Sequence, residues 1–464
     1  MSLSDRLRGI VSAGRSAAAS GAPLSPAAAP VLGADPLAID DLPGGGWHRR
    51  DGARCFVVEQ RVGGEAAYGD ARVGEIAERI ARASAQAPLL TPGAPASPPF
   101  VFFDLETTGL SGGAGTYAFL VGCGWFDDDG AFVTRQYLLA THGGERPMLE
   151  MVGVELARAG TLVSFNGKSF DAPVLETRHL FHRLEWTGGR LPHLDVLYAA
   201  RRFWGEPPAR RAEPSEPSGA NCSLGSLERQ VLGARRSGDV PGFEIPGRYF
   251  QFVRSGDARP LVTVLEHNRR DLLSLAGLTA RLLRLIGGGP GEARDAREAL
   301  ALGGVYRRAG LEARAGEAFV RAVAMADGPR AAGAMPWIKI EGLRALARAD
   351  RRERRYTEAA ARWRQVLDVP GCPPRVAREA AAALAIHHEH RLRDLAAAKA
   401  FALRSLERES SPAWSDAVRH RLARLERKMM PGPQTAASAR ALPFPSSSLP
   451  PSCGSRTSER RTSS

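Results

Sequence analysis

Apolar residues follow two different patterns along the chain, and the change from one to the other divides it into two regions. Over residues 100–286, short apolar runs typical of strands alternate with longer stretches of helical spacing. This alternation predicts an α/β mixed sheet with flanking helices. Over residues 292–428 the spacing is helical throughout, which predicts an all-α domain after the break Gly287-Gly-Gly-Pro-Gly.

The α/β region begins with three predicted antiparallel strands, and a fourth strand follows among the helices. The turn Asp127-Asp-Asp-Gly is a hairpin signal between the second and third strands. The predicted strands cover residues 99–106, 117–126, 132–139 and 161–165. The predicted helices cover residues 147–159, 171–183, 194–204, 223–232 and 261–286.

Segments of low complexity flank these regions. Residues 1–45 and 429–464 have the composition of a disordered leader and tail, and the insert 206–220 has that of a flexible loop. A small N-terminal segment, residues 46–86, carries one strand from Cys55 and one helix from Val73 to Ala83. Five prolines within residues 87–99 predict a linker after it.

Three stretches of the all-α region look alike. They cover residues 311–324, 356–367 and 395–406, and each follows another predicted helix. Their spacing of about 39–45 residues predicts degenerate tetratricopeptide-like repeats. An ordinary helical bundle is the alternative.

Composition excludes several protein classes. No apolar run in the 464 residues approaches the roughly 20 needed to span a membrane, and the N-terminus lacks the apolar core of a signal peptide. The five cysteines are scattered without a Cys-x-x-Cys pair, which argues against a disulfide framework or a zinc site. Together these features predict a cytoplasmic protein that has no contact with a membrane.

The net charge of +13 is unevenly placed. Basic and acidic residues balance up to residue 286, whereas residues 287–430 hold 28 basic against 18 acidic side chains. An excess of this kind is typical of a surface that binds a polyanion. A solvated, arginine-rich helical face is an equal alternative.

Asp104-Leu-Glu106 ends the first strand of the α/β region. The two-residue period of a strand puts both carboxylates on one face and Leu105 on the other. Clustered carboxylates repel one another unless a cation neutralises them, and oxygen ligands suit Mg²⁺ or Mn²⁺. Thr107-Thr108-Gly109 then offers hydroxyls and a small residue where a substrate could approach the backbone. A solvated strand end is the alternative.

Two further motifs lie later in the region. Asp171 follows Asn166 at the start of a predicted helix, where aspartate is also a common N-cap. His267 and Asp271 lie four residues apart on one helix face, so the carboxylate could complete a metal site and the imidazole could accept a proton from water. An ordinary His–Asp pair on a helix surface is the alternative.

With these motifs in this order, the chain resembles the DEDD (DnaQ-like) exonuclease superfamily, which has a ribonuclease-H-like fold. Residues 97–286 resemble more closely still the YprB-type ribonuclease-H-like domain, which tetratricopeptide-like helices follow in that family. The stretches that carry the closer resemblance are His193-Leu-Asp195-Val-Leu, Ala200-Arg-Arg-Phe-Trp204, Cys222-Ser-Leu-Gly-Ser-Leu-Glu228, Gly238-Asp-Val-Pro-Gly242, Ile245-Pro246, Tyr249-Phe250 and Glu266-His-Asn268.

The resemblance implies a 3′→5′ exonuclease that acts on DNA or RNA through two Mg²⁺ or Mn²⁺ ions. It implies that Asp104, Glu106, Asp171 and Asp271 hold the ions. His267 occupies the position where one subclass has tyrosine, so its role as a general base, a water-orienting group or neither stays open. Asp195 is expected as an accessory carboxylate on the helix 194–204. The residues expected to contact substrate are Thr107, Thr108, Gly109, Asn166 and Lys168.

The rival hypothesis is a catalytically retired nuclease domain that acts, with the helical repeats, as a scaffold binding nucleic acid or protein. Gly112-Gly-Ala-Gly115 lacks the ending of a nucleotide-binding loop and is interpreted as a turn. Further basic residues are candidates for phosphate contacts, with a solvated face as the alternative for each. They are Arg201, Arg202, Arg269 and Arg270.

Overall fold

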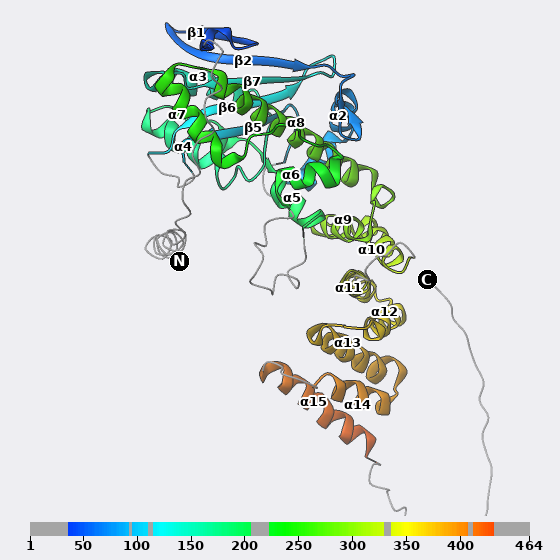
Figure 1. The fold of residues 1–464 in the computed structure, drawn as a ribbon. Helices are drawn as coiled ribbons and strands as arrows, with labels where there is room; N and C mark the ends of the chain where they lie inside the picture. Colours follow the sequence, from blue (N-terminus) through cyan, green and yellow to red (C-terminus); the bar gives the residue numbers. More distant parts are fainter. Residues whose placement is uncertain are drawn as a thin grey trace, which may run out of the picture. The chain divides into compact units, whose positions relative to one another are not determined.

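The computed structural model describes residues 36–91, 95–109, 115–205, 222–328, 336–406 and 412–430. The insert 206–220, residues 112–114 of the glycine-rich turn, and most of the predicted leader and tail lie outside this part of the chain. The chain divides into two compact units, Met1–Ala349 and Asp350–Ser464. The first unit holds the sheet and the second is helical (Figure 1).

A seven-stranded mixed sheet organises the first unit. Its strand order is β1-β2-β7-β6-β5-β8-β9, and β8 is parallel to both β5 and β9 while the other neighbours are antiparallel. The strands are β1 (Gly45–Arg50), β2 (Ala53–Val62), β5 (Phe100–Thr107), β6 (Ala118–Phe126), β7 (Phe132–Leu138), β8 (Thr161–Ser164) and β9 (His193–Asp195). A separate two-stranded ribbon consists of β3 (Ala67–Tyr68) and β4 (Ala71–Arg72). The predicted mixed sheet with flanking helices is therefore confirmed.

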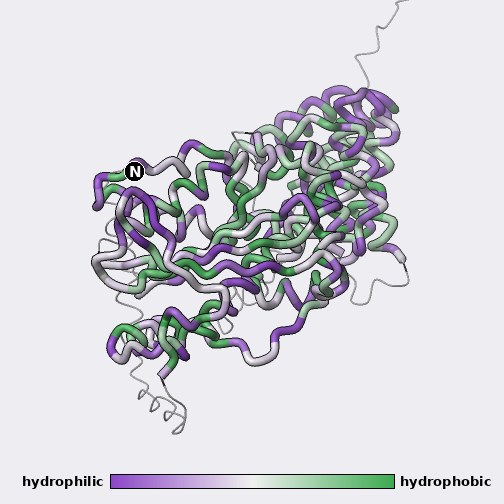
Figure 2. The backbone as a smooth tube through the Cα atoms, turned by 90° about the horizontal axis from the view of Figure 1, so that it is seen from above, coloured by the Kyte–Doolittle hydropathy of each residue, from purple (hydrophilic) through white to green (hydrophobic). Residues whose placement is uncertain are grey.

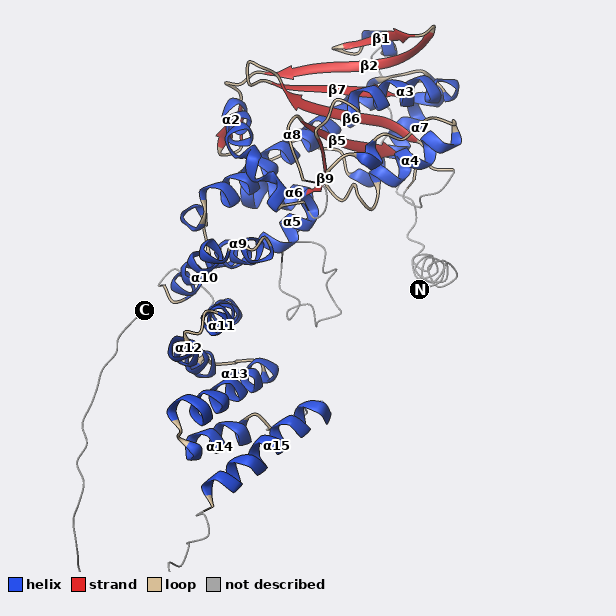
Figure 3. Cartoon of the chain, turned by 180° about the vertical axis from the view of Figure 1, so that it is seen from behind, coloured by secondary structure: helices blue, strands red, loops and turns tan. Residues whose placement is uncertain are grey.

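Helices cover both faces of this sheet and enclose two hydrophobic cores (Figures 1 and 3). One face packs against α3 (Glu145–Leu156), α4 (Asp171–Phe181) and α7 (Ile245–Ser255). The other packs against α2 (Val73–Ala83), α5 (Val196–Phe203), α6 (Leu224–Leu227) and the π-helical turn Glu228–Leu232. The long helix α8 (Arg259–Gly288) contributes its first turns to one core and its later turns to the other.

Strand β5 shows the alternation that places the candidate site. Phe100 and Phe102 lie in the core that contains α2 and α8, whereas Val101, Phe103 and Leu105 lie in the opposite core. Figure 2 shows hydrophobic and hydrophilic stretches interspersed along the described chain. Because side chains alternate between faces, Asp104 and Glu106 continue the Phe100–Phe102 row beneath α8.

The N-terminal strands differ from the prediction of a separate segment 46–86. Strand β2 pairs with β7 from Phe56–Leu138 to Val62–Phe132, so β1 and β2 extend the central sheet. The predicted linker 87–99 holds the end of a 3₁₀ turn, Ser84–Leu89, and its Ala87, Leu90 and Ala96 are buried in the core. The local sequence pattern correctly predicted the helix Val73–Ala83 and its bounds. It cannot show which strand pairs with β2, because that strand lies about 80 residues further along the chain.

Two further elements differ from the prediction. The expected helix 194–204 is a strand, β9, followed by α5, and Asp195 lies at their junction. A three-residue strand is too short to show a period of two, so its sequence looked like the start of the helix. Helix α7 was not predicted, and the 223–232 helix divides into α6 and a π-helical turn.

The helices that follow α8 belong partly to the sheet unit. Leu302 of α9 (Ala296–Arg308) and Phe319 of α10 (Glu312–Ala326) lie in the same core as Leu282 of α8. Helix α11 (Pro336–Arg352) adds Leu346 to that core. The break between the units therefore falls after Ala349, where the prediction placed a boundary at residues 287–291.

Four α-helices and the π-helical turn His388–Leu392 form most of the described part of the second unit, which also holds the end of α11. The α-helices are α12 (Tyr356–Asp368), α13 (Pro374–His387), α14 (Leu395–Arg404) and α15 (Pro412–Met429). The three stretches predicted to repeat coincide with α10, α12 and α14, and each follows another helix. Their assignment as tetratricopeptide-like repeats stays a prediction. None of the helices described in either unit combines the length and apolar character needed to cross a membrane.

Candidate active site

The four carboxylates named from the sequence come from three elements of the first unit. Asp104 and Glu106 lie on β5, Asp171 is the first residue of α4, and Asp271 lies midway along α8. The parallel pair β5 and β8 brings the loop before α4 beside the end of β5, and α8 crosses the same strand. The fold therefore brings all four into one electrostatic cluster.

The pKa values of this cluster show how closely the charges interact. Burial, followed by the negative charges of Asp271, Glu106 and Asp171, raises the pKa of Asp104 well above its usual range. Burial and the charges of Asp271, Asp171 and Asp239 do the same for Glu106. Burial and the nearby Asp195 raise the pKa of Asp171 to about 7. Like charges held in a poorly solvated site favour the neutral form unless a cation is bound.

A buried amide relay holds Asp104. Asn268 of α8, which is 0% exposed, donates from Nδ2 to Oδ2 of Asp104 at 2.9 Å. Gln136 of β7 donates in turn to Oδ1 of Asn268 at 2.9 Å and to the carbonyl of Leu265 at 2.8 Å. The relay lowers the pKa of Asp104, although burial and its neighbours dominate. It fixes one carboxylate oxygen and leaves the other available to a ligand.

Glycine at position 122 makes this relay possible. A β-carbon on Gly122 of β6 would lie 2.1 Å from Oδ1 of Asn268 and 2.9 Å from the Leu272 side chain. We expect Gly122→Ala to displace Asn268, to destabilise the protein by about 1–3 kcal/mol and to weaken Mn²⁺ binding. Urea denaturation and Mn²⁺ titration check this. Gly46→Ala, in an open position of β1, is the matched control, and equal effects of the two changes would contradict the relay.

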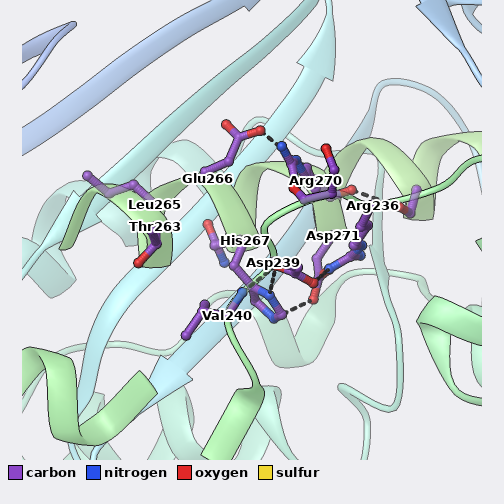
Figure 4. A network of polar contacts seen from close by, with 12 residues as sticks. Arg236, Asp239, Val240, Thr263, Leu265, Glu266, His267, Arg270 and Asp271 are labelled. Carbon is purple, nitrogen blue, oxygen red and sulfur yellow. Dashed lines mark hydrogen bonds and ion pairs between the residues drawn. The ribbon is translucent and has the colours of Figure 1, made fainter. Parts of the chain in front are cut away.

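Asp271 is engaged by a cation from the chain itself. Arg236, which follows the π-helical turn, donates Nη2 to both Asp271 and Glu228 and Nη1 to Asp239 at 3.0 Å. Burial raises the pKa of Asp271, and the positive charge and hydrogen bond of Arg236 oppose the increase. Figure 4 shows the Arg236 side chain directed at Asp271.

His267 lies between two carboxylates in the same view (Figure 4). Its Nδ1 is 2.7 Å from Oδ1 of Asp239, and its Nε2 is 3.5 Å from Oδ2 of Asp271. Although burial raises the pKa of Asp239, the hydrogen bonds from His267 and Arg236 hold it below its usual range. An ionised Asp239 selects the tautomer with hydrogen on Nδ1, which leaves Nε2 of His267 free to accept a proton.

Asp195 organises the loop that leads to Asp171. Its carboxylate accepts hydrogen bonds from the backbone amides of Asn166 at 2.8 Å, Lys168 at 3.2 Å and Leu197 at 3.1 Å. Asn166 adopts a φ of 66°, a left-handed conformation that asparagine tolerates. The Lys168 side chain is exposed. Asp195 therefore caps α5 and shapes the loop at once.

Thr107, Thr108 and Gly109 form a turn beside the carboxylate cluster. The Thr107 hydroxyl donates to the carbonyl of Gly109 at 3.0 Å, and the Thr108 hydroxyl accepts from the amide of Tyr117 at 3.0 Å. Both hydroxyls thus stabilise the turn, and among the described residues none would meet a β-carbon at Gly109.

The donor chemistry of the cluster fits a divalent cation. Asp104, Glu106, Asp171 and Asp271 provide the oxygen ligands that Mg²⁺ or Mn²⁺ prefers, and burial together with the charges of Asp271 and Asp171 raises the pKa of both Asp104 and Glu106. Within the described residues, however, no three His, Cys, Asp or Glu side chains are arranged as they stand to hold a metal ion. The ion pair with Arg236 holds the Asp271 carboxylate in its orientation, and the hydrogen bond from Asn268 holds the Asp104 carboxylate in its orientation.

Several residues of this site were not identified from the sequence. They are Gln136, Glu228, Arg236, Asp239 and Asn268. Glu228, Asp239 and Asn268 lie within stretches that carry the family resemblance, which was the available signal. No sequence pattern pointed to Arg236 or Gln136, because Arg236 follows a π-helical turn and Gln136 occupies an ordinary position in a strand.

Two comparisons with known proteins match part of the chain. The model of the RNase_H superfamily matches residues 101–283. Over 191 residues the chain is 38% identical to the uncharacterized protein YprB of Bacillus subtilis (strain 168), a match that covers 40% of this chain. The match spans 42% of the length of that relative. Residues 101–283 therefore form a domain of the RNase_H superfamily.

Proposed function

We propose that this domain is a metal-dependent nuclease that hydrolyses phosphodiester bonds, acting as a 3′→5′ exonuclease on single-stranded ends. The observation that carries the proposal is the buried cluster of Asp104, Glu106, Asp171 and Asp271, in which burial and then the charges of Asp271 and Asp171 raise the pKa of both Asp104 and Glu106. Surface carboxylates that merely end a strand would be solvated and would not interact in this way. A strained cluster of this kind is typical of a functional site.

Asp104, Glu106, Asp171 and Asp271 would together hold two Mg²⁺ or Mn²⁺ ions. Such ions, when bound, neutralise the scissile phosphate, lower the pKa of a water and stabilise the departing 3′ oxygen. Asn268 keeps Asp104 oriented through the 2.9 Å hydrogen bond. His267 takes the proton of the attacking water at Nε2, and Asp239 holds its ring in the required tautomer. The turn Thr107–Gly109, beside the cluster, would contact the nucleic acid.

The direct test is incubation of the purified chain with labelled nucleic acid in Mg²⁺ and in Mn²⁺. Single- and double-stranded DNA and RNA, labelled at the 5′ end or at the 3′ end, separate the possible activities. A 3′→5′ exonuclease releases the 3′ label as a mononucleotide at once and shortens the 5′-labelled strand stepwise. Internal fragments without early release of the 3′ label would contradict the exonuclease, and no cleavage would contradict the enzyme.

Loss of the imidazole is expected to slow cleavage. We expect His267→Ala to reduce kcat on the order of 10²-fold, since general base catalysis contributes about that much. Asp239→Asn should cause a smaller loss, because it leaves the ring in place without selecting its tautomer. His267→Tyr should retain more activity than His267→Ala. Single-turnover rates measure all three, and wild-type rates in His267→Ala would assign the residue to packing.

One observation favours the second candidate, a retired nuclease that acts as a binding scaffold. Arg236 already neutralises Asp271, so this carboxylate does not depend on a metal for a counter-charge. Titration with Mn²⁺, followed by its electron paramagnetic resonance signal, separates the two candidates. Saturable binding that Asp104→Ala weakens supports the enzyme, whereas its absence supports the scaffold.

A further inference from the structure

The exposed face of α5 begins at the carboxylate cluster and carries three solvent-facing side chains. Asp195, whose charge raises the pKa of Asp171, is the N-cap of this helix. Three residues of α5 have exposed side chains, Tyr198, Arg201 and Arg202, and the rest of the helix is buried. At 100° per residue these three share one face, and Arg202 lies about 10 Å along the axis from Asp195.

The arginines of this face have no acidic partners in the part of the chain that the structure describes. Within the described residues, no ion pair or hydrogen bond joins Arg201 or Arg202 to a carboxylate, and the same holds for Arg307 and Arg308 on the neighbouring helix α9. Arg269 and Arg270 are different, because each pairs with Glu266 at 2.5 Å. Four arginines were candidates for phosphate contact from the sequence. Among the described residues, Arg269 and Arg270 are paired with a carboxylate, whereas Arg201 and Arg202 are not.

These arginines interact unfavourably with one another. Partial burial lowers the pKa of Arg202, and burial followed by the charges of Arg202 and Arg307 lowers the pKa of Arg308. Arg307 also lies over the ring of Phe319, with 5.5 Å from Cζ to the ring centroid. Like charges brought together without counter-ions attract an anion that extends over several of them.

Aromatic and basic side chains continue this face toward the cluster. Tyr198 is 47% exposed, and its hydroxyl lies 3.1 Å from that of Ser169 in the loop before Asp171. In the same loop, Phe170 is 40% exposed and the Lys168 side chain is exposed. Exposed rings interleaved with cations are typical of surfaces that stack bases and contact phosphates of single strands.

We propose that single-stranded nucleic acid follows α5 away from the candidate site. Its bases stack on Tyr198 and Phe170, and its phosphates contact Arg201 and Arg202 and then Arg307 and Arg308. This path rests on the proposed function, since it begins where the 3′ end would be cleaved. It identifies the substrate as a flexible single strand, because a duplex buries its bases and offers no ring to stack.

The experiment measures binding of fluorescein-labelled oligothymidylate and oligouridylate to the full chain carrying Asp104→Ala, which prevents turnover. The test variant adds Arg202→Gln and Arg308→Gln. The control adds Arg79→Gln and Arg82→Gln on α2, which removes the same charge from arginines already paired with Glu75 and Glu78. A series of salt concentrations gives the slope of log affinity against log salt for each protein.

We expect the test variant to lose about 1.4 in slope, because each phosphate contact in a single strand contributes about 0.7. The control should keep the slope of the parent. Tyr198→Ala should weaken binding by about 5- to 150-fold at unchanged slope, and Tyr198→Phe should preserve it. Equal slopes for test and control, tighter binding of a matched duplex, or no binding by any of the proteins at low salt would each overturn the path.

The path and the proposed function fail in different ways. Loss of slope in the test variant, together with no cleavage by the unmodified chain, would overturn the nuclease and leave a single-strand-binding surface. If the unmodified chain cleaves nucleic acid but the salt slope is the same with and without Arg202→Gln and Arg308→Gln, the path is overturned and the nuclease is not.

Discussion

Asp104→Ala is expected to reduce phosphodiester cleavage on the order of 10³-fold or more while the protein stays folded. The carboxylate would hold both ions, and metal activation lowers the barrier by several kcal/mol. The fold should tolerate the change because it removes one of several like charges, and metal-free Asp104→Ala should unfold no more easily than the unmodified protein. Single-turnover cleavage and urea denaturation measure the two effects.

A matched control comes from the β6–β7 turn. Asp128 is exposed there, so Asp128→Ala should change neither cleavage nor stability. Asp271→Ala should repeat the loss caused by Asp104→Ala. Undiminished cleavage by Asp104→Ala, after contaminating nuclease has been excluded, would remove these carboxylates from the reaction. Equal loss in Asp128→Ala would point to a general effect of acidic residues.

The largest loss of stability is expected for Glu145→Gln. The Glu145 carboxylate is buried at the start of α3 and accepts hydrogen bonds from Nε and Nη2 of Arg178, a side chain that is 1% exposed. His182 adds a third contact from Nε2 at 2.7 Å. Removing one charge of a buried pair costs about 3–5 kcal/mol, because the guanidinium of Arg178 then lacks its carboxylate in a poorly solvated site.

The pH dependence of stability supplies an independent check. Although burial raises the pKa of Glu145, the hydrogen bonds from Arg178 and His182 hold it below its usual range. The stabilisation from a depressed carboxyl pKa is complete above the unfolded value and is lost as the pH falls through the folded value. The free-energy difference between Glu145→Gln and the unmodified protein should therefore be largest near neutral pH and should narrow below about pH 4.

An exposed pair on the same helix is the control for Glu145. Arg146 and Glu150 form an ion pair one turn apart on the surface of α3, so Glu150→Gln should change the free energy of unfolding by about 0.5 kcal/mol or less. Urea denaturation at several pH values compares the two variants. Equal effects would mean that the buried pair does not stabilise the contact between α3 and α4. That contact matters for function because α4 begins with Asp171.

The sequence by itself determined the parts of the site that depend on local periodicity. Alternation along β5 was enough to place Asp104 and Glu106 on one face and Leu105 on the other. Helical spacing was enough to place His267 and Asp271 on one side of α8. A predicted helix began at Asp171, and α4 begins there. These features follow from the backbone geometry of a single element, so no distant residue is needed to infer them.

Only the tertiary structure decided which groups surround those carboxylates. Arg236 contacts Asp271, which lies 35 residues away in the sequence, and Asn268 contacts Asp104, which lies 164 residues away. Neither contact therefore produces a local sequence pattern. The same holds for the pairing of β2 with β7 and for the packing of α9 and α10 in the sheet unit. Whether an arginine is neutralised likewise depends on neighbours that folding supplies. Long-range contacts depend on how elements pack together, and one sequence encodes that packing only collectively.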